Sequence, residues 1–324
     1  MSRIFRYQES INRFIKKKSC INNLDNNIKT NMLNIINDNN HVNSIILLTV
    51  LGTQGFKSGK PLHGYYMAAG IEIMEIIANI TDNRLFFDKK YGKQNIDQLL
   101  YGVIGSINIC LSQNIESIQQ NINKDELINV FSISVKLIGN KLNYLLLSDT
   151  VKTDGYITKS DIIKFHFSKF DSKNVSNKLK KIKQANKKSL MDFIQRKYGV
   201  VCELSLVLGW LLGGGNKKMV KKLEKMGKYL AIMIKSSRDF VNLESDLEIA
   251  KDSTNNMIIN LGFQNTFELF MDNKQKFIEG CIVMDIYTNT VKEVIDLMES
   301  KIDTIIDQSS PDMKSHYTLE SIKT

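Results

Sequence analysis

The chain has 324 residues, of which 43% are hydrophobic and only 2 are proline, so it can form one large domain or two small ones around a sizeable core. Its four cysteines (Cys20, Cys110, Cys202 and Cys281) contain no CxxC pair, which excludes the usual zinc-site spacing and gives no sign of a disulfide framework. The net charge of +10 favours anionic partners such as diphosphates, membrane surfaces or an acidic subunit, although a solvated basic surface is the commoner explanation. No nucleic-acid-binding motif is present, and we expect no nucleic-acid partner.

The first segment, residues 1–19, mixes basic and apolar residues, and Glu9 is its only acid. This composition is typical of an amphipathic mitochondrial transit segment, which predicts a mitochondrial location. It is about equally typical of a first helix whose apolar face docks on the domain, and both interpretations stay open. We therefore predict an N-terminal targeting or docking segment over residues 1–40 and one helical domain over residues 41–324.

Apolar residues with a helical period continue through most of the chain. This period predicts helices over residues 41–51, 62–80, 97–119, 123–147, 159–167, 189–212, 217–248, 255–272 and 274–304. Glycine, proline and polar residues predict loops over residues 52–61, 81–94 and 148–158, and the basic stretch 168–189 breaks the helical pattern. The apolar runs are too short to span a bilayer. The sequence thus predicts an all-α, single-domain bundle of roughly ten helices without a transmembrane segment.

Several tempting sites have simpler explanations. The glycine run 213–215 lacks the Lys-Ser/Thr of a phosphate-binding loop and predicts a helix end. The histidines show no HExxH spacing, and His166 is expected to be packed or exposed rather than catalytic. Glu72 and Glu75 share a helix with apolar neighbours, so we expect polar packing partners rather than an acid/base pair.

A family resemblance begins at residues 197–242. Lys197-Tyr198-Gly199 is similar to a Lys-Thr-Gly motif. Residues 227–231 match a Gly-x-x-Leu-Gly pattern except for a final alanine, Lys235 stands where a glutamine is usual, and residues 238–242 stand where Asp-Asp-x-x-Asp is usual. This order of motifs resembles the trans-polyprenyl diphosphate synthases, and it implies an isoprenoid-synthase-type helical bundle.

The N-terminal half resembles the same family more faintly. Residues 68–83 are similar to the helix that ends in the first aspartate-rich motif, with Asp82 and Asn83 at its leading Asp-Asp. Residues 59–63, GKPLH, resemble the Gly-Lys-x-x-Arg motif that grips isopentenyl diphosphate, but that register leaves no room for the next family helix. The favoured register makes residues 41–51 that helix and puts the gripping positions near Asn40 and Asn43.

The resemblance implies chemistry that this chain is poorly equipped to perform. In the family, magnesium ions bridge an allylic diphosphate and two facing carboxylate clusters, so each cluster needs several carboxylates. Here Arg238 and Asn242 replace aspartates of the second motif and leave Asp239. Arginine does not bind magnesium and repels it. We therefore predict no catalytic residue, and the metal-ligand candidates at these motifs are Asp82 and Asp239.

The cations at these motifs allow a second interpretation. They could bind a diphosphate directly, although salt bridges between helices are the commoner outcome. The diphosphate-binding candidates are Lys197, Lys235, Arg238 and Arg84.

The closest branch in this resemblance is the non-catalytic second subunit of heteromeric decaprenyl or solanesyl diphosphate synthases, which make the ubiquinone side chain. That branch lacks the aspartate motifs, and residues 148–158 and 227–240 are similar to it. The resemblance implies a pseudoenzyme with no cofactor of its own, in a dimer or larger oligomer with an aspartate-intact synthase that holds magnesium.

Two alternative functions stay open. One is a scaffold subunit of a larger mitochondrial assembly. The other is a divergent active prenyltransferase that uses other carboxylates, such as Asp88, Asp97, Asp246 or Asp252.

Overall fold

The structure is a computed structural model. It describes residues 2–37, 41–54, 61–119, 123–146, 151–158, 160–164, 167 and 169–307. The chain divides into two compact units. Unit 1 comprises Met1–Ser148, Arg196–Lys228 and Ile278–Val294, and unit 2 comprises Asp149–Gln195, Tyr229–Phe277 and Ile295–Thr324. Residues 1–40, expected as a separate segment, fall within unit 1.

Unit 1 is helical throughout its described part. Its elements are α1 (Arg3–Lys18), η1 (Cys20–Asn23), α2 (Asn26–Asn37), α3 (Val42–Gln54), η2 (Pro61–Gly64), α4 (Tyr65–Asp82), α5 (Arg84–Tyr91), α6 (Lys93–Ile118), α7 (Lys124–Leu146), α10 (Val200–Leu212) and η6 (Lys217–Met219). Three further helices have residues in both units: α11 (Val220–Val241), α14 (Phe263–Val283) and α15 (Asn289–Asp307).

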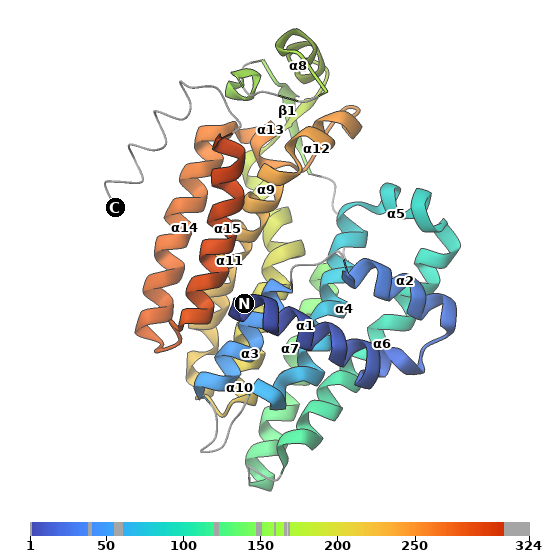
Figure 1. The fold of residues 1–324 in the computed structure, drawn as a ribbon, viewed down its shortest axis with the longest axis vertical. Helices are drawn as coiled ribbons and strands as arrows, with labels where there is room; N and C mark the ends of the chain where they lie inside the picture. Colours follow the sequence, from blue (N-terminus) through green and yellow to red (C-terminus); the bar gives the residue numbers. More distant parts are fainter. Residues whose placement is uncertain are drawn as a thin grey trace. The chain divides into compact units, whose positions relative to one another are not determined.

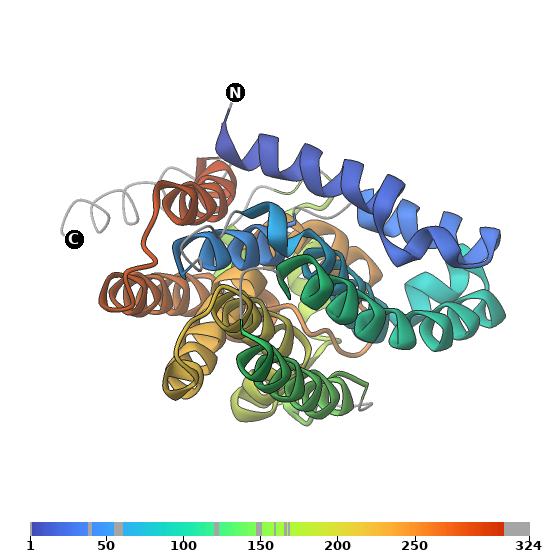
Figure 2. The ribbon, with the colours of Figure 1, turned by 90° about the horizontal axis from the view of Figure 1, so that it is seen from below.

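The core of unit 1 forms around α10. Every residue from Val200 to Leu212 is buried, as expected for a helix that is apolar on all sides. Helices α3, α4 and α7 pack against it, and α4 also packs against α6 (Figures 1 and 2). The helix ends at the predicted glycine run, where Gly214 has a φ of 95°, a conformation that favours glycine.

Helix α1 docks on unit 1 through its apolar face. Ile4, Ile11 and Ile15 are buried, and the Phe14 ring stacks on Tyr65 with centroids 5.5 Å apart. In Figure 2, α1 runs along the upper edge of the view.

Unit 2 contains the remaining elements, which are shorter. They are β1 (Thr153–Tyr156), η4 (Asp161–Lys164), α8 (Ser172–Leu179), β2 (Lys183–Ala185), α9 (Lys187–Ile194), α12 (Leu243–Ile249) and α13 (Met257–Leu261). A π-helical turn, η5, covers Gln195–Gly199, where the chain passes from unit 2 to unit 1. The two strands pair antiparallel, with Thr153 opposite Ala185. Strands this short carry too few residues for a period-two pattern, so the sequence predicted none.

Several predicted boundaries are wrong. Helix α5 forms inside the predicted loop 81–94, and only the short turn η4 is helical in the described part of 159–167. The predicted helix 217–248 divides at Asn242, and the predicted break at residue 273 is absent because α14 continues to Val283. The real break follows α14, where Asp285 has a φ of 54° that a helix does not accept.

All four cysteines are buried and free, and Cys20 Sγ lies 3.4 Å from Cys110 Sγ. Among the residues that the structure describes, no helix is both long and apolar enough to cross a membrane.

Candidate functional site

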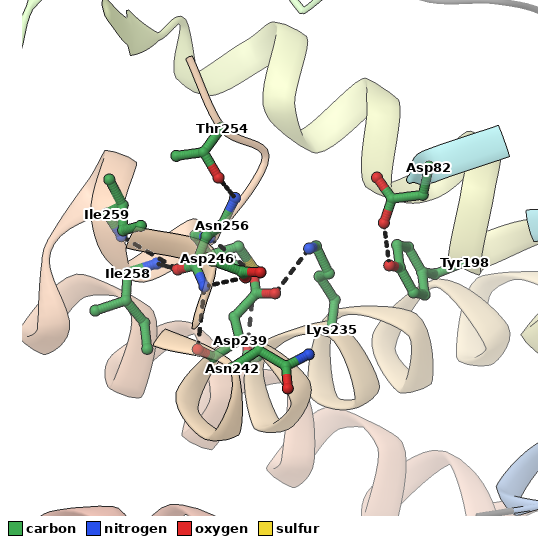
Figure 3. A network of polar contacts seen from close by, with 12 residues as sticks. Asp82, Tyr198, Lys235, Asp239, Asn242, Asp246, Thr254, Asn256, Ile258 and Ile259 are labelled. Atoms are coloured by element: carbon green, nitrogen blue, oxygen red, sulfur yellow. Dashed lines mark hydrogen bonds and ion pairs between the residues drawn. The ribbon is translucent and has the colours of Figure 1, made fainter. Parts of the chain in front are cut away.

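The first aspartate position lies at the end of α4 in unit 1. Asp82 is the last residue of this helix, and its Oδ2 accepts a hydrogen bond of 2.5 Å from the hydroxyl of Tyr198 (Figure 3). Tyr198 lies in the turn before α10, and its ring is buried. The tyrosine that replaces the usual threonine of the Lys-Thr-Gly motif therefore binds the remaining aspartate of the first motif. Asn83, the next residue, is exposed.

Arg84 begins α5 and joins it to α6. Its Nε lies 2.6 Å from Asp88 and its Nη2 lies 2.5 Å from Asp97. Burial by itself would lower the pKa of Arg84, but hydrogen bonds and charges from both aspartates raise it. Asp88 and Asp97, two of the carboxylates considered for an active enzyme, are thus paired with this arginine.

Lys197 is buried beside the end of α7. Its Nζ donates a hydrogen bond of 2.7 Å to the carbonyl oxygen of Leu145. Carbonyls in the last turn of a helix lack intrahelical partners, and a cation is favourable there. Lys197 was predicted as a diphosphate-binding candidate. In this structure its ammonium group is a hydrogen-bond donor to a carbonyl in the last turn of α7.

The second aspartate position lies on α11 in unit 2. Lys235 Nζ is 2.7 Å from Asp239 Oδ1, and the side chains are only 5% and 2% exposed (Figure 3). Asp239 Oδ2 accepts a 2.7 Å hydrogen bond from the amide of Met257, the first residue of α13. Burial raises the pKa of Asp239 to about 6, although Lys235 and the Met257 amide oppose the shift. Both carboxylate oxygens are therefore bonded within the protein.

Asn256 extends this network and was not among the residues predicted from the sequence. Its Nδ2 donates to the carbonyl of Asp239 at 3.1 Å and to Asp246 Oδ2 at 2.8 Å. Its Oδ1 accepts from the amides of Ile258 and Ile259, which makes it the N-cap of α13. An asparagine immediately before an apolar run is the signal that could have indicated this cap.

The other two positions of the second motif are less enclosed. Arg238 and Asn242 are half-buried, and Asn242 is the residue before α12.

No family model and no curated protein matches the sequence. The structure, in contrast, resembles solved prenyl diphosphate synthases. An FPP/GFPP synthase from Zymomonas mobilis has a TM-score of 0.55 at 10% identity, with 92% of this chain and 97% of that chain covered. A geranylgeranyl pyrophosphate synthetase from Geoglobus acetivorans has a TM-score of 0.57 at 10% identity, with the same coverage of 92% and 97%. A geranyltranstransferase from Thermotoga maritima has 0.54 at 11% identity, covering 93% and 96%.

The chain has the isoprenoid-synthase fold. The predicted all-α, isoprenoid-synthase-type bundle is confirmed. At 10–11% identity the likeness concerns the fold alone.

On this isoprenoid-synthase fold, the aspartate positions do not fit a magnesium–diphosphate site. A hard cation needs several free oxygen ligands. Asp82 is bonded to Tyr198, and Asp239 is bonded to Lys235 and to a backbone amide. Within the described part of the chain, no group of three or more His, Cys, Asp or Glu side chains is arranged to hold a metal ion.

Unit 1 of this fold also buries a polar cluster between α3 and α4. Glu72 lies 3.0 Å from His41 Nδ1 and accepts a 2.5 Å hydrogen bond from Ser44, while Glu75 accepts one of 2.5 Å from Asn43. The expectation that both glutamates are polar packing partners is confirmed. Asn43, a predicted diphosphate-gripping position, is bonded to Glu75; Asn40, Gly59, Lys60 and His166 lie outside the described residues.

Replacing Tyr198 by phenylalanine is expected to lower the free energy of unfolding by about 2 kcal/mol. The ring packing is kept while a hydrogen bond to a carboxylate is lost. Urea unfolding measures the change, and Tyr144→Phe on an exposed tyrosine of α7 is the matched control. A loss no larger than that of the control would contradict the importance of the Asp82 contact.

The His41–Glu72 pair predicts a pH-dependent stability. Burial alone would lower the pKa of His41, but the hydrogen bond and charge of Glu72, with the charge of Glu75, raise it. Because the folded pKa is raised, the contribution is complete below the unfolded pKa of about 6.5 and is lost as pH rises through the folded value. We expect His41→Gln to remove this decline in urea midpoints, and His63→Gln, at a half-buried site, to leave it. Equal slopes for wild type and His41→Gln would contradict it.

Proposed function

We propose that this chain is a non-catalytic subunit that assembles with an aspartate-intact, long-chain polyprenyl diphosphate synthase. The observation that carries the proposal is that both surviving motif aspartates are bonded internally, Asp82 by Tyr198 and Asp239 by Lys235. The proposal includes ubiquinone side-chain synthesis, which the sequence resemblance implies, and a mitochondrial location, which the composition of residues 1–19 predicts.

At both motif positions the surviving carboxylate already has a partner within the protein. Ionising a diphosphate through magnesium requires oxygen ligands that are free to bind the ion. Each motif of this chain retains one aspartate, and each aspartate already has a tyrosine or lysine partner in its place. A subunit whose motif carboxylates are already occupied would depend on its partner for magnesium and for the catalytic carboxylates.

The test is condensation of labelled isopentenyl diphosphate with an allylic diphosphate in the presence of magnesium. The chain, an aspartate-intact synthase from the same organism, and their mixture are assayed separately. We expect no product from this chain alone and more product from the mixture than from the synthase. Activity of this chain alone would overturn the proposal in favour of a divergent enzyme, and a mixture no better than the synthase would favour a scaffold.

Two variants assign the chemistry within the mixture. Alanines in the partner's first aspartate motif should abolish all product. Restoring aspartates in this chain by Asn83→Asp, Arg238→Asp and Asn242→Asp should leave it inactive alone, since Asp82 and Asp239 stay bonded to Tyr198 and Lys235. Activity of the restored chain would show that those two contacts do not block metal binding.

The proposed location has its own test. Full-length protein with a C-terminal tag is followed by cell fractionation, and N-terminal sequencing of the recovered protein shows whether α1 is kept. Recovery outside mitochondria would overturn the location but leave the subunit proposal intact.

A further inference from the structure

Helix α1 is held on unit 1 along one side. Its buried residues, Ile4, Ile11 and Ile15, lie on that side. The backbone amide of Arg3 donates a 2.9 Å hydrogen bond to Glu293, and the amide of Ile4 donates to the same carboxylate at 3.4 Å. The apolar face of this helix is therefore occupied by the protein itself, and only the opposite face is open to a partner.

The open face of α1 is strongly cationic. Residues that are seven and eleven positions apart return to nearly the same side of an α-helix, so Arg6, Arg13 and Lys17 form one row. All three are exposed, as is Lys16 beside the row, and Glu9 is the only acidic residue of the helix. None of these four cations forms an ion pair with any residue that the structure describes.

An aromatic ring accompanies this row. Phe5 precedes Arg6 and is 44% exposed, although most apolar side chains of α1 are covered. Exposed lysines and arginines are attracted to the anionic lipids of a bilayer surface, and an exposed phenylalanine beside them can enter the headgroup layer. Nucleic-acid binding favours several aromatic rings among the cations, and α1 exposes one.

We propose that the outer face of α1 docks this protein on an anionic phospholipid surface. The contact is peripheral: the isoleucines of α1 stay buried in unit 1, and Arg6, Arg13, Lys16 and Lys17 face the lipid headgroups. Each cation close to an anionic leaflet strengthens binding by roughly fivefold. The attraction is screened by salt because exposed charges are involved. This inference does not depend on the proposed subunit role.

The test is cosedimentation of the full chain with vesicles of mixed phosphatidylcholine and phosphatidylserine, or of phosphatidylcholine alone. We expect binding to the anionic vesicles only, and its loss at high salt. The variant Arg6→Glu/Arg13→Glu/Lys17→Glu removes three cations and adds three anions, so it should weaken binding by at least about a hundredfold. The control Lys180→Glu/Lys187→Glu/Lys188→Glu changes the net charge equally at exposed sites of unit 2 and should weaken it by less than about threefold.

A single substitution tests the proposal without the risk that the triple variant misfolds. Phe5→Ala keeps the charge, and it should weaken vesicle binding while leaving the thermal unfolding midpoint unchanged. Equal weakening by both triple variants would overturn the proposal, because net charge and not α1 would then be responsible. Absence of binding to anionic vesicles would overturn it too. If the chain bound RNA more tightly than vesicles, and the α1 triple variant lost that RNA binding, the ligand of α1 would be nucleic acid and not lipid.

Discussion

Replacing Lys235 by methionine is expected to destabilise the protein by about 4 kcal/mol. The substitution keeps a long side chain in the core but leaves the carboxylate of Asp239 buried without its cation. The two side chains are 5% and 2% exposed, so water does not take the place of the lysine. Breaking a buried pair on one side is costly because the remaining charge has lost its partner while it stays desolvated.

Urea unfolding of the Lys235→Met variant measures this loss. The matched control is Lys276→Met, because Lys276 pairs with Asp272 at the same i,i+4 spacing at 2.6 Å but with side chains 47% and 55% exposed. That exposed pair should contribute only about 0.3 kcal/mol. Similar losses in the two variants would contradict the claim that burial makes the Lys235 pair important.

The contribution of the Lys235–Asp239 pair to stability depends on pH. Burial raises the pKa of Asp239 to about 6, so between its unfolded and folded pKa values the native state binds more protons than the unfolded state. The contribution of Asp239 to stability therefore decreases as pH rises through this window. The loss in Lys235→Met should be smaller at about pH 5, where Asp239 takes up a proton, than at about pH 7.

Replacing Gly209 by alanine is expected to destabilise the protein by about 3 kcal/mol. A Cβ atom at this position of α10 would lie 2.6 Å from the carbonyl oxygen of Leu47 and 3.1 Å from the Cβ of Val50, both on α3. The nearest obstacle is backbone, so the clash is relieved only by moving one helix away from the other. That movement would loosen the packing at the centre of the unit 1 core.

The control substitution is expected to change the stability in the opposite direction. Gly139 lies inside α7, and a Cβ there would meet nothing within 4 Å. Alanine is the better helix former, so Gly139→Ala should stabilise the protein by about 1 kcal/mol. Thermal or urea unfolding compares the two variants. A stabilising effect at Gly209 would contradict the close approach of α3 and α10.

Sequence by itself was sufficient for the features that depend on local pattern. The helical period predicted the all-α fold, the continuous apolar run of α10 predicted a helix ending at Gly213–Gly215, and the motif positions showed Arg238 and Asn242 in place of aspartates. These features are readable because periodicity and residue chemistry act over a few turns of one helix. The ends of helices depend on caps and tertiary packing, which explains the misplaced break at residue 273.

Only the tertiary structure decided what the surviving carboxylates do. Asp82 and Tyr198 are 116 residues apart in sequence, and their hydrogen bond depends on how α4 packs near the start of α10. Lys235 and Asp239 are visible as an i,i+4 pair, yet the sequence did not show that both are buried or that Met257 supplies a third contact. Burial controls the energy of such contacts because it removes the water that would otherwise solvate each charge.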